Sequence, residues 1–372
     1  MFRHKTFIVL FLLFFVGLFS YLSAQQSKQT FLYPIVKADK WGFIDQTGKV
    51  VVFPQFESVD EFQDGFARVI KEGKVIFIDT SGKTVLRPEF QIVRDFSEGL
   101  AAVNNGEKRN SIGLIIEPGR WGYIDKTGQL AIPMNFTHAE PFSEGLAAAG
   151  LDKRTGFIDR TGKMIFEVPL DVTLEFKEGI VGVLLSGSIS YFDRTGKKLL
   201  TPPLDASPSS HSFSEGLATI ETGGKSGYID KTGKMVIPAE FVDADDFSEG
   251  LAPAQVMGET RWCPTDENGS RYGSPKSFGY IDKTGKMVIA PQFEYAAPFR
   301  EGLARVSICG KAGFIDKTGK VVIPLKFDEA FSFRGGLARV GNRSSEGFSY
   351  IDKAGKFIWP SPLDTSGSGS LH

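Results

Sequence analysis

Short runs of aliphatic and aromatic residues alternate with polar, glycine-containing turns, and this pattern recurs along the whole chain. Its clearest landmark is an aromatic residue, an aliphatic residue and Asp, followed after two further residues by glycine. Four of the eight intervals between successive Asp residues are 34 residues long, which predicts a tandem-repeat protein. The landmark occurs nine times, once with Phe192 in the aliphatic place, and its Asp is at Asp45, Asp79, Asp125, Asp159, Asp193, Asp230, Asp282, Asp316 and Asp352.

Each repeat unit predicts short strands joined by tight turns. Around Asp282, two aromatic and β-branched runs flank Asp-Lys-Thr-Gly, a strong hairpin signal. Gly285 can adopt a positive φ without a Cβ penalty, and the Asp282 carboxylate can accept hydrogen bonds from the turn amides. A Phe-x-x-Gly motif then begins a third strand, so we expect three strands of about five residues in each unit. The structural turn residues predicted in this way include Asp45, Gly48, Asp125, Gly128, Asp230, Gly233, Asp282, Gly285, Asp316 and Gly319.

One unit of this size cannot bury enough apolar surface alone, so neighbouring units must complete each core. The sequence therefore predicts an all-β tandem array of about nine units of roughly 34 residues, with the recurrent Phe residues as its packing layer. A propeller blade usually has four strands in about 40 to 50 residues, so the shorter unit favours an open, curved stack over a closed propeller-like ring. The expected units span about 41–74, 75–120, 121–154, 155–188, 189–225, 226–277, 278–311, 312–347 and 348–360.

The two ends of the chain differ from the repeats. Arg3 and Lys5 precede an apolar run that ends at Leu22-Ser23-Ala24, a layout typical of a signal peptide over residues 1–24. An uncleaved anchor is the alternative, but the run is shorter than the roughly 20 residues that span a bilayer. We expect a linker over 25–32, the array over 33–360 and a flexible tail over 361–372. The mature protein is then exported, periplasmic or secreted, with no transmembrane span.

Composition excludes several classes of function. The 43 Lys and Arg residues balance 44 Asp and Glu residues, which leaves no basic surplus for nucleic acid. Four scattered His residues and the absence of a nucleophile elbow or phosphate-binding loop predict no metal, no cofactor and no catalytic residues. The nine turn Asp residues are better explained as turn caps than as calcium ligands, because each brings one carboxylate. In an oxidising compartment, Cys263 and Cys309 could form a single disulfide.

Two insertions after the second glycine of a unit, near 104–120 and 257–276, are the residues that the repeat does not require. The second contains Arg and aromatic residues, the types enriched where protein surfaces bind partners. The first contains Lys and Arg beside the apolar residues Ile112, Leu114, Ile115 and Ile116. The alternative is a pair of tolerated surface hairpins, one pinned by a Trp and a Cys263–Cys309 bridge. Since both leave the same connection of the unit, both are expected at the same edge of the array. The candidate binding residues are Lys108, Arg109, Arg120, Arg261, Trp262, Arg271 and Tyr272.

At its repeated motif the chain resembles the WG-repeat (KWG-repeat) proteins. Their Trp-Gly-aromatic-Ile-Asp-x-x-Gly signature is complete at 41–48 and at 121–128. Other units depart from the first two residues: Phe278-Gly279 and Ala312-Gly313 keep the glycine, and Val75-Ile76 keeps neither. The resemblance covers roughly residues 33–360. It implies bacterial origin, frequent export and a β-rich tandem structure, and it implies no catalytic residues.

These observations favour a non-enzymatic, exported repeat protein whose surface binds a protein or glycan partner in the cell envelope or outside the cell. A hydrolase on a propeller-like ring, with carboxylates converging at one mouth, is the alternative. A purely structural spacer is the third possibility. Two carboxyl groups with raised pKa in one deep pocket would favour the enzyme, whereas a long shallow groove would favour binding.

Overall fold

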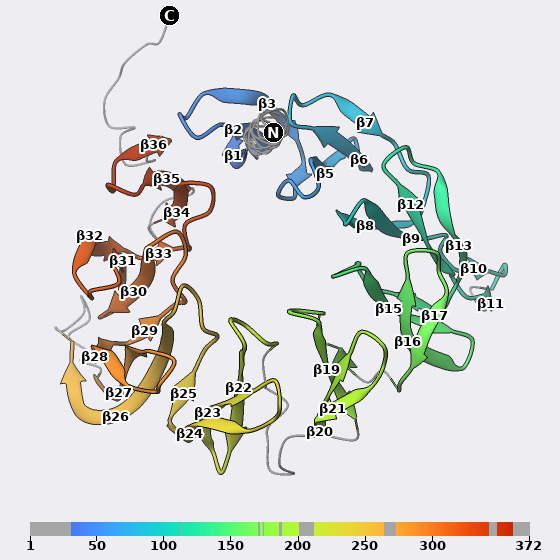
Figure 1. The fold of residues 1–372 in the computed structure, drawn as a ribbon. Helices are drawn as coiled ribbons and strands as arrows, with labels where there is room; N and C mark the ends of the chain where they lie inside the picture. The colour runs from blue at the N-terminus through green and yellow to red at the C-terminus, as the bar shows by residue number, and fades with distance from the viewer. Residues whose placement is uncertain are drawn as a thin grey trace, which may run out of the picture.

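The computed structural model describes residues 31–112, 114–169, 172–173, 175–185, 188–200, 212–263, 273–341 and 348–359. These residues form nine small antiparallel sheets and one separate hairpin, arranged around a ring (Figure 1). Each sheet is a blade that runs outward from the centre of the ring. Within the described ranges, no helix has the length and hydropathy needed to cross a membrane.

The strands of the first five blades follow one another along the chain. Blade 1 contains β1 (Tyr33–Lys37), β2 (Lys40–Ile44) and β3 (Val50–Phe56). Blade 2 contains β4 (Ser58–Val59), β5 (Phe66–Lys71), β6 (Lys74–Asp79) and β7 (Thr84–Leu86). Blade 3 contains β8 (Ile92–Ser97), β9 (Leu100–Asn104), β12 (Trp121–Asp125) and β13 (Leu130–Phe136), and its hairpin β10 (Lys108–Arg109) and β11 (Ile115–Glu117) is separate. Blade 4 contains β14 (His138–Ala139), β15 (Leu146–Leu151), β16 (Arg154–Asp159) and β17 (Met164–Glu167), and blade 5 contains β18 (Val172–Thr173), β19 (Ile180–Leu185), β20 (Ser188–Asp193) and β21 (Lys198–Leu200).

The remaining four blades complete the ring. Blade 6 contains β22 (Leu217–Thr222), β23 (Lys225–Asp230) and β24 (Met235–Phe241). Blade 7 contains β25 (Asp243–Ala244), β26 (Ala252–Trp262), β27 (Gly273–Ile281) and β28 (Met287–Phe293). Blade 8 contains β29 (Tyr295–Ala296), β30 (Ala304–Ile308), β31 (Lys311–Ile315) and β32 (Val321–Phe327), and blade 9 contains β33 (Glu329–Ala330), β34 (Leu337–Gly341), β35 (Phe348–Asp352) and β36 (Phe357–Trp359).

The expectation of three strands per unit is wrong by one. The segment after the recurrent Phe forms an additional strand of only two residues, such as Tyr295–Ala296, at the inner edge of its blade. A unit of about 34 residues can therefore hold the four strands of a propeller blade, because its innermost strand is so short. The repeat in the sequence is also offset from the blade: each unit supplies the two outer strands of one blade and the two inner strands of the next.

The all-β array of nine units is confirmed, but the ring is closed, and the favoured open stack is wrong. Blade 9 packs directly against blade 1: the hydroxyl of Tyr350 donates to the carbonyl of Pro34 at 3.0 Å, and that of Tyr33 donates to Arg334 O at 3.0 Å. Tyr33, Ile35 and Tyr350 share one buried core cluster. The rotation between successive blades therefore brings the ninth blade back to the first, and the fold is a nine-bladed β-propeller (Figure 1).

The glycine after the signature Trp position lies under a bulge in the outer strand. In blade 1, Trp41 pairs with Phe56 but Phe43 pairs with Val52, so β3 has two more residues than β2 between these pairs. The extra backbone passes directly over the glycine, leaving no room for a Cβ. In blade 2 the pairing of the outer strand stops at Leu86, before it reaches the position of this glycine. That position is occupied by Ile76, which is buried.

The predicted signal peptide over 1–24 and flexible tail over 361–372 lie outside the described residues. The segment expected as a linker over 25–32 ends in residues that belong to the ring. Leu32 is buried in the core beneath blade 1, and Phe31 packs with Tyr33 and Ile35 at the closing junction. The ring therefore includes residues that precede Tyr33.

Candidate functional site

The turn between the two outer strands is the same in nearly every blade. In blade 7, one carboxylate oxygen of Asp282 accepts hydrogen bonds from the Thr284 amide at 2.9 Å, the Thr284 hydroxyl at 2.5 Å and the Lys286 amide at 3.2 Å. Gly285 has φ +83° and donates its amide to the Asp282 carbonyl. The other predicted pairs, at Asp45 and Gly48, Asp125 and Gly128, Asp230 and Gly233, and Asp316 and Gly319, have the same geometry. These side chains are engaged within their own turns.

Acid is expected to weaken these turns. The Thr284 hydroxyl, and then its amide, hold the pKa of Asp282 below its usual value, and Thr318 does the same for Asp316. A carboxyl with a lower pKa in the folded state contributes stability above its unfolded pKa and loses it as the pH falls through the folded pKa. We expect the unfolding temperature to be steady above about pH 5 and to fall below about pH 4. The measurement is thermal unfolding against pH. The variant with Asp282→Asn and Asp316→Asn should be less stable at pH 7 and should decline less steeply in acid; an unchanged slope would refute this origin.

A second turn, between the two inner strands, fastens each blade to the next. Its residues Glu215 and Gly216 both have positive φ, 52° and 87°, as a two-residue type I′ turn requires. The Glu215 carboxylate accepts the amide of Gly250 in blade 7 at 3.1 Å and forms an ion pair with Lys283 at 3.0 Å. The sequence analysis did not identify this contact between blades, because its two partners lie far apart along the chain. Within the described residues the acid is Asp64, Glu98, Glu144, Glu178, Glu215, Glu249 or Glu301, and each accepts the amide of a glycine in the next blade.

The first insertion forms the hairpin β10–β11, which extends from blade 3 beyond the ring (Figure 1). Its base is fastened because Asn105 accepts the Arg120 amide at 2.7 Å, and its tip is closed because the Asn110 side chain accepts the Leu114 amide at 2.9 Å. The three predicted binding cations of this insertion are paired: Lys108 with Glu117 at 2.6 Å, Arg109 with Glu107 at 2.7 Å, and Arg120 with Asp152 at 3.8 Å.

What the hairpin exposes is aliphatic. Ile112 is 77% exposed, Leu114 61%, Ile115 48% and Ile116 60%. Such a run of exposed apolar residues is unusual on a protein surface. These residues were noted in the sequence only as neighbours of the cations, because aliphatic residues alone give no sign of whether they will be buried.

The second insertion extends β26 and β27 from blade 7, across the ring from the first (Figure 1). Arg261 and Trp262 lie on β26, where the backbone alone is described, and Arg271 and Tyr272 lie outside the described residues. Both insertions extend the hairpin between the second and third strands of a blade and therefore leave the same face of the ring. They lie four blades apart, on opposite sides of the ring, and make no common site.

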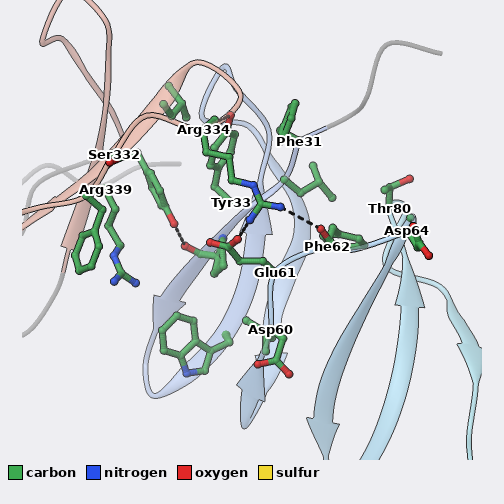
Figure 2. Close-up of a pocket in the computed structure, with 18 residues that line it drawn as sticks. Phe31, Tyr33, Asp60, Glu61, Phe62, Asp64, Thr80, Ser332, Arg334 and Arg339 are labelled. Atoms are coloured by element: carbon green, nitrogen blue, oxygen red, sulfur yellow. Dashed lines mark hydrogen bonds and ion pairs between the residues drawn. The ribbon is translucent and has the colours of Figure 1, made fainter. Parts of the chain in front are cut away.

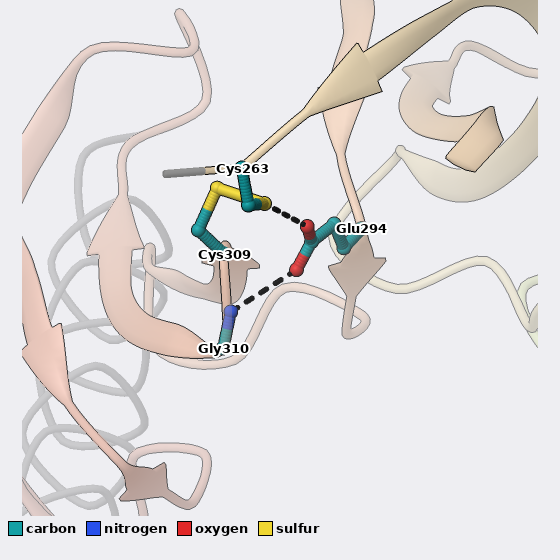
Figure 3. Close-up of a disulfide and its surroundings, with 4 residues drawn as sticks. All are labelled: Cys263, Glu294, Cys309 and Gly310. Carbon is teal, nitrogen blue, oxygen red and sulfur yellow. Dashed lines mark hydrogen bonds between the residues drawn. A yellow bond between two sulfur atoms is a disulfide. The ribbon is translucent and has the colours of Figure 1, made fainter. Parts of the chain in front are cut away.

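A disulfide fastens this second insertion to blade 8. Cys263 and Cys309 are bonded, with their Cα atoms 5.3 Å apart, and Cys263 is buried (Figure 3). Glu294 lies beside the bridge and accepts the amide of Gly310 at 3.1 Å (Figure 3). Although the two cysteines and Glu294 could in principle bind a metal ion, the sulfur atoms are bonded to each other and are not thiolate ligands.

A cleft with a volume of about 760 Å³ lies where blades 9, 1 and 2 meet (Figure 2). Arg334 of blade 9 crosses its mouth, forming an ion pair with Glu61 and donating to the carbonyl of Phe62, both in blade 2 (Figure 2). Tyr33 lies in its wall, and burial raises the pKa of Tyr33 to about 12, so that its hydroxyl remains a donor across the closing junction at neutral pH.

The carboxyl groups of the cleft are engaged in contacts within the fold. Burial, with a further contribution from Asp95, raises the pKa of Asp60, which nonetheless lies 2.7 Å from the Arg68 guanidinium. Glu61 pairs with Arg334, and Asp64 accepts the amide of Gly99 in the next blade. Within the described lining of the cleft, Asp60, Glu61 and Asp64 are therefore each held by a partner in the fold.

A closed ring of nine blades, with both insertions on one face and the turn contacts of the recurrent acids on the other, defines a tandem-repeat β-propeller. The chain belongs to the WG containing repeat family: the family's repeat matches residues 41–74, 77–108, 121–154, 227–258, 278–311 and 313–343, together more than half of the chain. The expected family is thereby confirmed. No curated protein matches the chain.

The solved structures that match this chain have little sequence in common with it. A crystal structure described as that of the eukaryotic initiation factor matches with a TM-score of 0.61 and 13% identity, over 88% of this chain and 95% of that one. Apo AztD from Citrobacter koseri matches with a TM-score of 0.42 and 11% identity, over 88% of this chain and 93% of that one. At these identities the likeness to the initiation factor extends to the propeller fold alone.

Proposed function

We propose that this WG-repeat propeller is an exported, non-enzymatic scaffold that binds a protein partner in the cell envelope through the aliphatic tip of the β10–β11 hairpin. The observation that carries the proposal is the exposure of Ile112, Leu114, Ile115 and Ile116 on an element that the propeller does not need for its own core. Residues off the repeat are free to serve recognition, while the ring holds them in place.

The chemistry of the hairpin favours a protein over the other partners. Its two cations are neutralised by Glu107 and Glu117, so it offers no free positive charge to an anionic membrane or a phosphate. Aliphatic side chains have no hydrogen-bonding groups for the hydroxyls of a glycan. An apolar groove on a protein surface matches the exposed isoleucines, because burying them releases water from both surfaces.

The N-terminal pattern and the disulfide support export. Residues 1–24 have the charge and apolar run of a signal peptide, and disulfides persist in oxidising compartments outside the cytoplasm. The periplasm and the cell exterior are both compatible with the proposal.

The variant with Ile112→Ser, Leu114→Ser and Ile116→Ser is expected to lose partner capture and to keep its unfolding temperature, because these side chains are exposed. The measurement is photo-crosslinking in the envelope fraction from a benzoyl-phenylalanine placed at Ile115, with the cross-linked protein identified by mass spectrometry. The matched control carries Leu130→Ser, Val288→Ser and Val321→Ser, which are exposed apolar residues on outer strands.

The proposal predicts one protein that is cross-linked in the wild type and in the control and is lost in the hairpin variant. Equal cross-linking in all three proteins would overturn it. Sedimentation velocity provides a second test, because a dimer that only the hairpin variant abolishes would mean that the tip binds another copy of this chain.

A further inference from the structure

In the described part of the chain, β1 forms the inner edge of blade 1, as β22 does in blade 6, and the edge of β1 lies beside a cleft. Every other blade that the structure describes completely has four strands, whereas blade 1 consists of β1, β2 and β3, and β1 forms its inner edge without a strand partner in the described part of the chain. The cleft of about 760 Å³ lies along this edge, between the inner strands of blades 9 and 2 (Figure 2). An unpaired strand edge inside a cleft is a site for one more extended segment.

The pairing in other blades gives the register of the missing strand. In blade 2, Val59 of the inner strand pairs with Val69, two residues before the end of β5 at Lys71. The same count from the end of β1 places Ile35 opposite the corresponding residue of the missing strand, and Val36 opposite the residue before it.

The sequence beyond β36 keeps the spacing of the repeat. In blade 8, Phe327 lies eleven residues after the turn residue Asp316, is buried, and pairs across its blade with Ala312. In the ninth unit, the residue eleven positions after the turn residue Asp352 is Leu363. All nine units have Phe or Leu here, namely Phe56, Phe90, Phe136, Leu170, Leu204, Phe241, Phe293, Phe327 and Leu363.

The same count identifies an inner strand. Ala330 lies fourteen residues after Asp316 and pairs with Val340 as part of β33. Fourteen residues after Asp352 is Ser366. The unit before blade 5 gives a close precedent, since Pro-Leu-Asp at 169–171 leads directly into β18 (Val172–Thr173), and Pro-Leu-Asp at 362–364 leads into Thr365-Ser366.

We propose that the chain's own segment 360–366 binds in this cleft and forms the inner strand of blade 1, with Thr365 opposite Val36 and Ser366 opposite Ile35. The segment is long enough, because Thr365 lies six positions after Trp359, just as Glu329 lies six positions after Ile323 in the step from blade 8 to blade 9. The propeller would then be closed by backbone pairing between its two ends as well as by side-chain packing.

The surroundings of the cleft fit a segment that ends at Ser366. At other junctions a Phe seventeen residues after the turn Asp packs on an aromatic ring of the preceding blade, as Phe299 packs on Tyr280 with ring centroids 4.9 Å apart. At the closing junction Tyr33 already occupies this place, 5.3 Å from Tyr350. The docked segment therefore needs no such Phe, and residue 369 is glycine.

The charge of the segment also matches blade 1. Glu57 and Glu294, twelve residues after their turn Asp, accept the amide of Gly73 and of Gly310 in the hairpin of the following blade. Asp364 is the twelfth residue after Asp352. In blade 1, the hairpin that corresponds to those of Gly73 and Gly310 joins β1 to β2, and the exposed lysines Lys37 and Lys40 pair at its end.

The test is a cysteine pair in the full chain, with the native disulfide retained. Val36→Cys combined with Thr365→Cys should form a second disulfide under mild oxidation, because directly paired strand residues lie within disulfide reach. The control combines Val36→Cys with Ser370→Cys, which lies in the tail but beyond the register. The readout is the linked peptide after proteolysis, quantified by mass spectrometry.

The expected result is a linked peptide as the main product for residue 365 and a minor one for residue 370. Equal linkage at both positions, no linkage at either, or linkage only between two chains would overturn the proposal. As a second measurement, Leu363→Asp should abolish the linkage and lower the unfolding temperature, whereas Leu371→Asp should change neither. If Leu363→Asp left the linkage intact, the register would be wrong.

Discussion

Replacing Gly227 with alanine is expected to lower the free energy of unfolding by about 3 kcal/mol. An added Cβ would lie 2.7 Å from both the Ile237 carbonyl oxygen and the Ala239 amide nitrogen. Both atoms belong to the backbone of the outer strand, so no side chain can rotate away. The bulge of β24 would have to open, which would break pairing in the outer half of blade 6. The measurement is urea unfolding followed by circular dichroism.

Gly216 in the same blade provides the control. It has φ +87°, and no heavy atom lies within 4 Å of an added Cβ. Alanine there costs only the strain of the left-handed conformation, about 1–2 kcal/mol. If the two variants were equally destabilised, the explanation of the signature glycine by close approach of the outer strand would fail.

These glycines illustrate what the sequence can and cannot predict. The turn glycine at 285 was predictable, because Asp-Lys-Thr-Gly is a local pattern with a local cause. The requirement for Gly227 arises from the path of β24, ten or more residues further along the chain, and is not visible in the local pattern. Blade 2 illustrates the same dependence: its outer strand ends early, and Ile76 is accommodated.

Ring closure was missed for a similar reason. The number of residues per unit argued against a propeller, because a two-residue inner strand such as β29 has no pattern of its own. Closure also depends on contacts between residues more than 300 positions apart, such as Tyr350 and Pro34.

A sequence signal for the closing junction existed nonetheless. The residue after the turn Asp is Lys or Arg in seven units, and in each of these it donates to the carbonyl of the acid in the preceding blade. The two exceptions are Gln46 and Thr80. They belong to blades 1 and 2, on either side of the incomplete inner edge, where Gly335 replaces the acid and blade 1 has no inner turn among its described strands. Both exceptions to the repeat thus lie beside the inner edge of blade 1.

At the insertions, residue type was a poor guide to exposure. Arg and Lys were favoured as binding residues, but acids of the same hairpin and of blade 4 neutralise Lys108, Arg109 and Arg120. Whether a charged side chain is available to a partner depends on its neighbours in space. The exposed isoleucines could be recognised only once the hairpin was seen to lie outside every core cluster of the described chain.

Removing the disulfide is expected to have the other large effect. The variant with Cys263→Ala and Cys309→Ala should lose about 2–4 kcal/mol of unfolding free energy, because the bridge closes a loop with a sequence separation of 46 residues. It also joins the extended strand β26 of blade 7 to the hairpin of blade 8, so its loss should increase hydrogen exchange first at the ends of β26 and β27. Replacing both cysteines avoids leaving a free thiol. The measurements are urea unfolding and hydrogen exchange by mass spectrometry.

A reducing agent separates the effect of the bond from that of the buried Cys263 side chain. Reduction of the wild-type protein should shift its unfolding midpoint most of the way to that of the double variant and should leave the double variant unchanged. An equal shift in both proteins would mean that the reductant acts elsewhere. If reduction had no effect while the double variant remained destabilised, the lost unfolding free energy would come from the packing of Cys263 against its neighbours. Blades 7 and 8 would then be held together by their shared core and by the ion pair of Lys317 with Glu249.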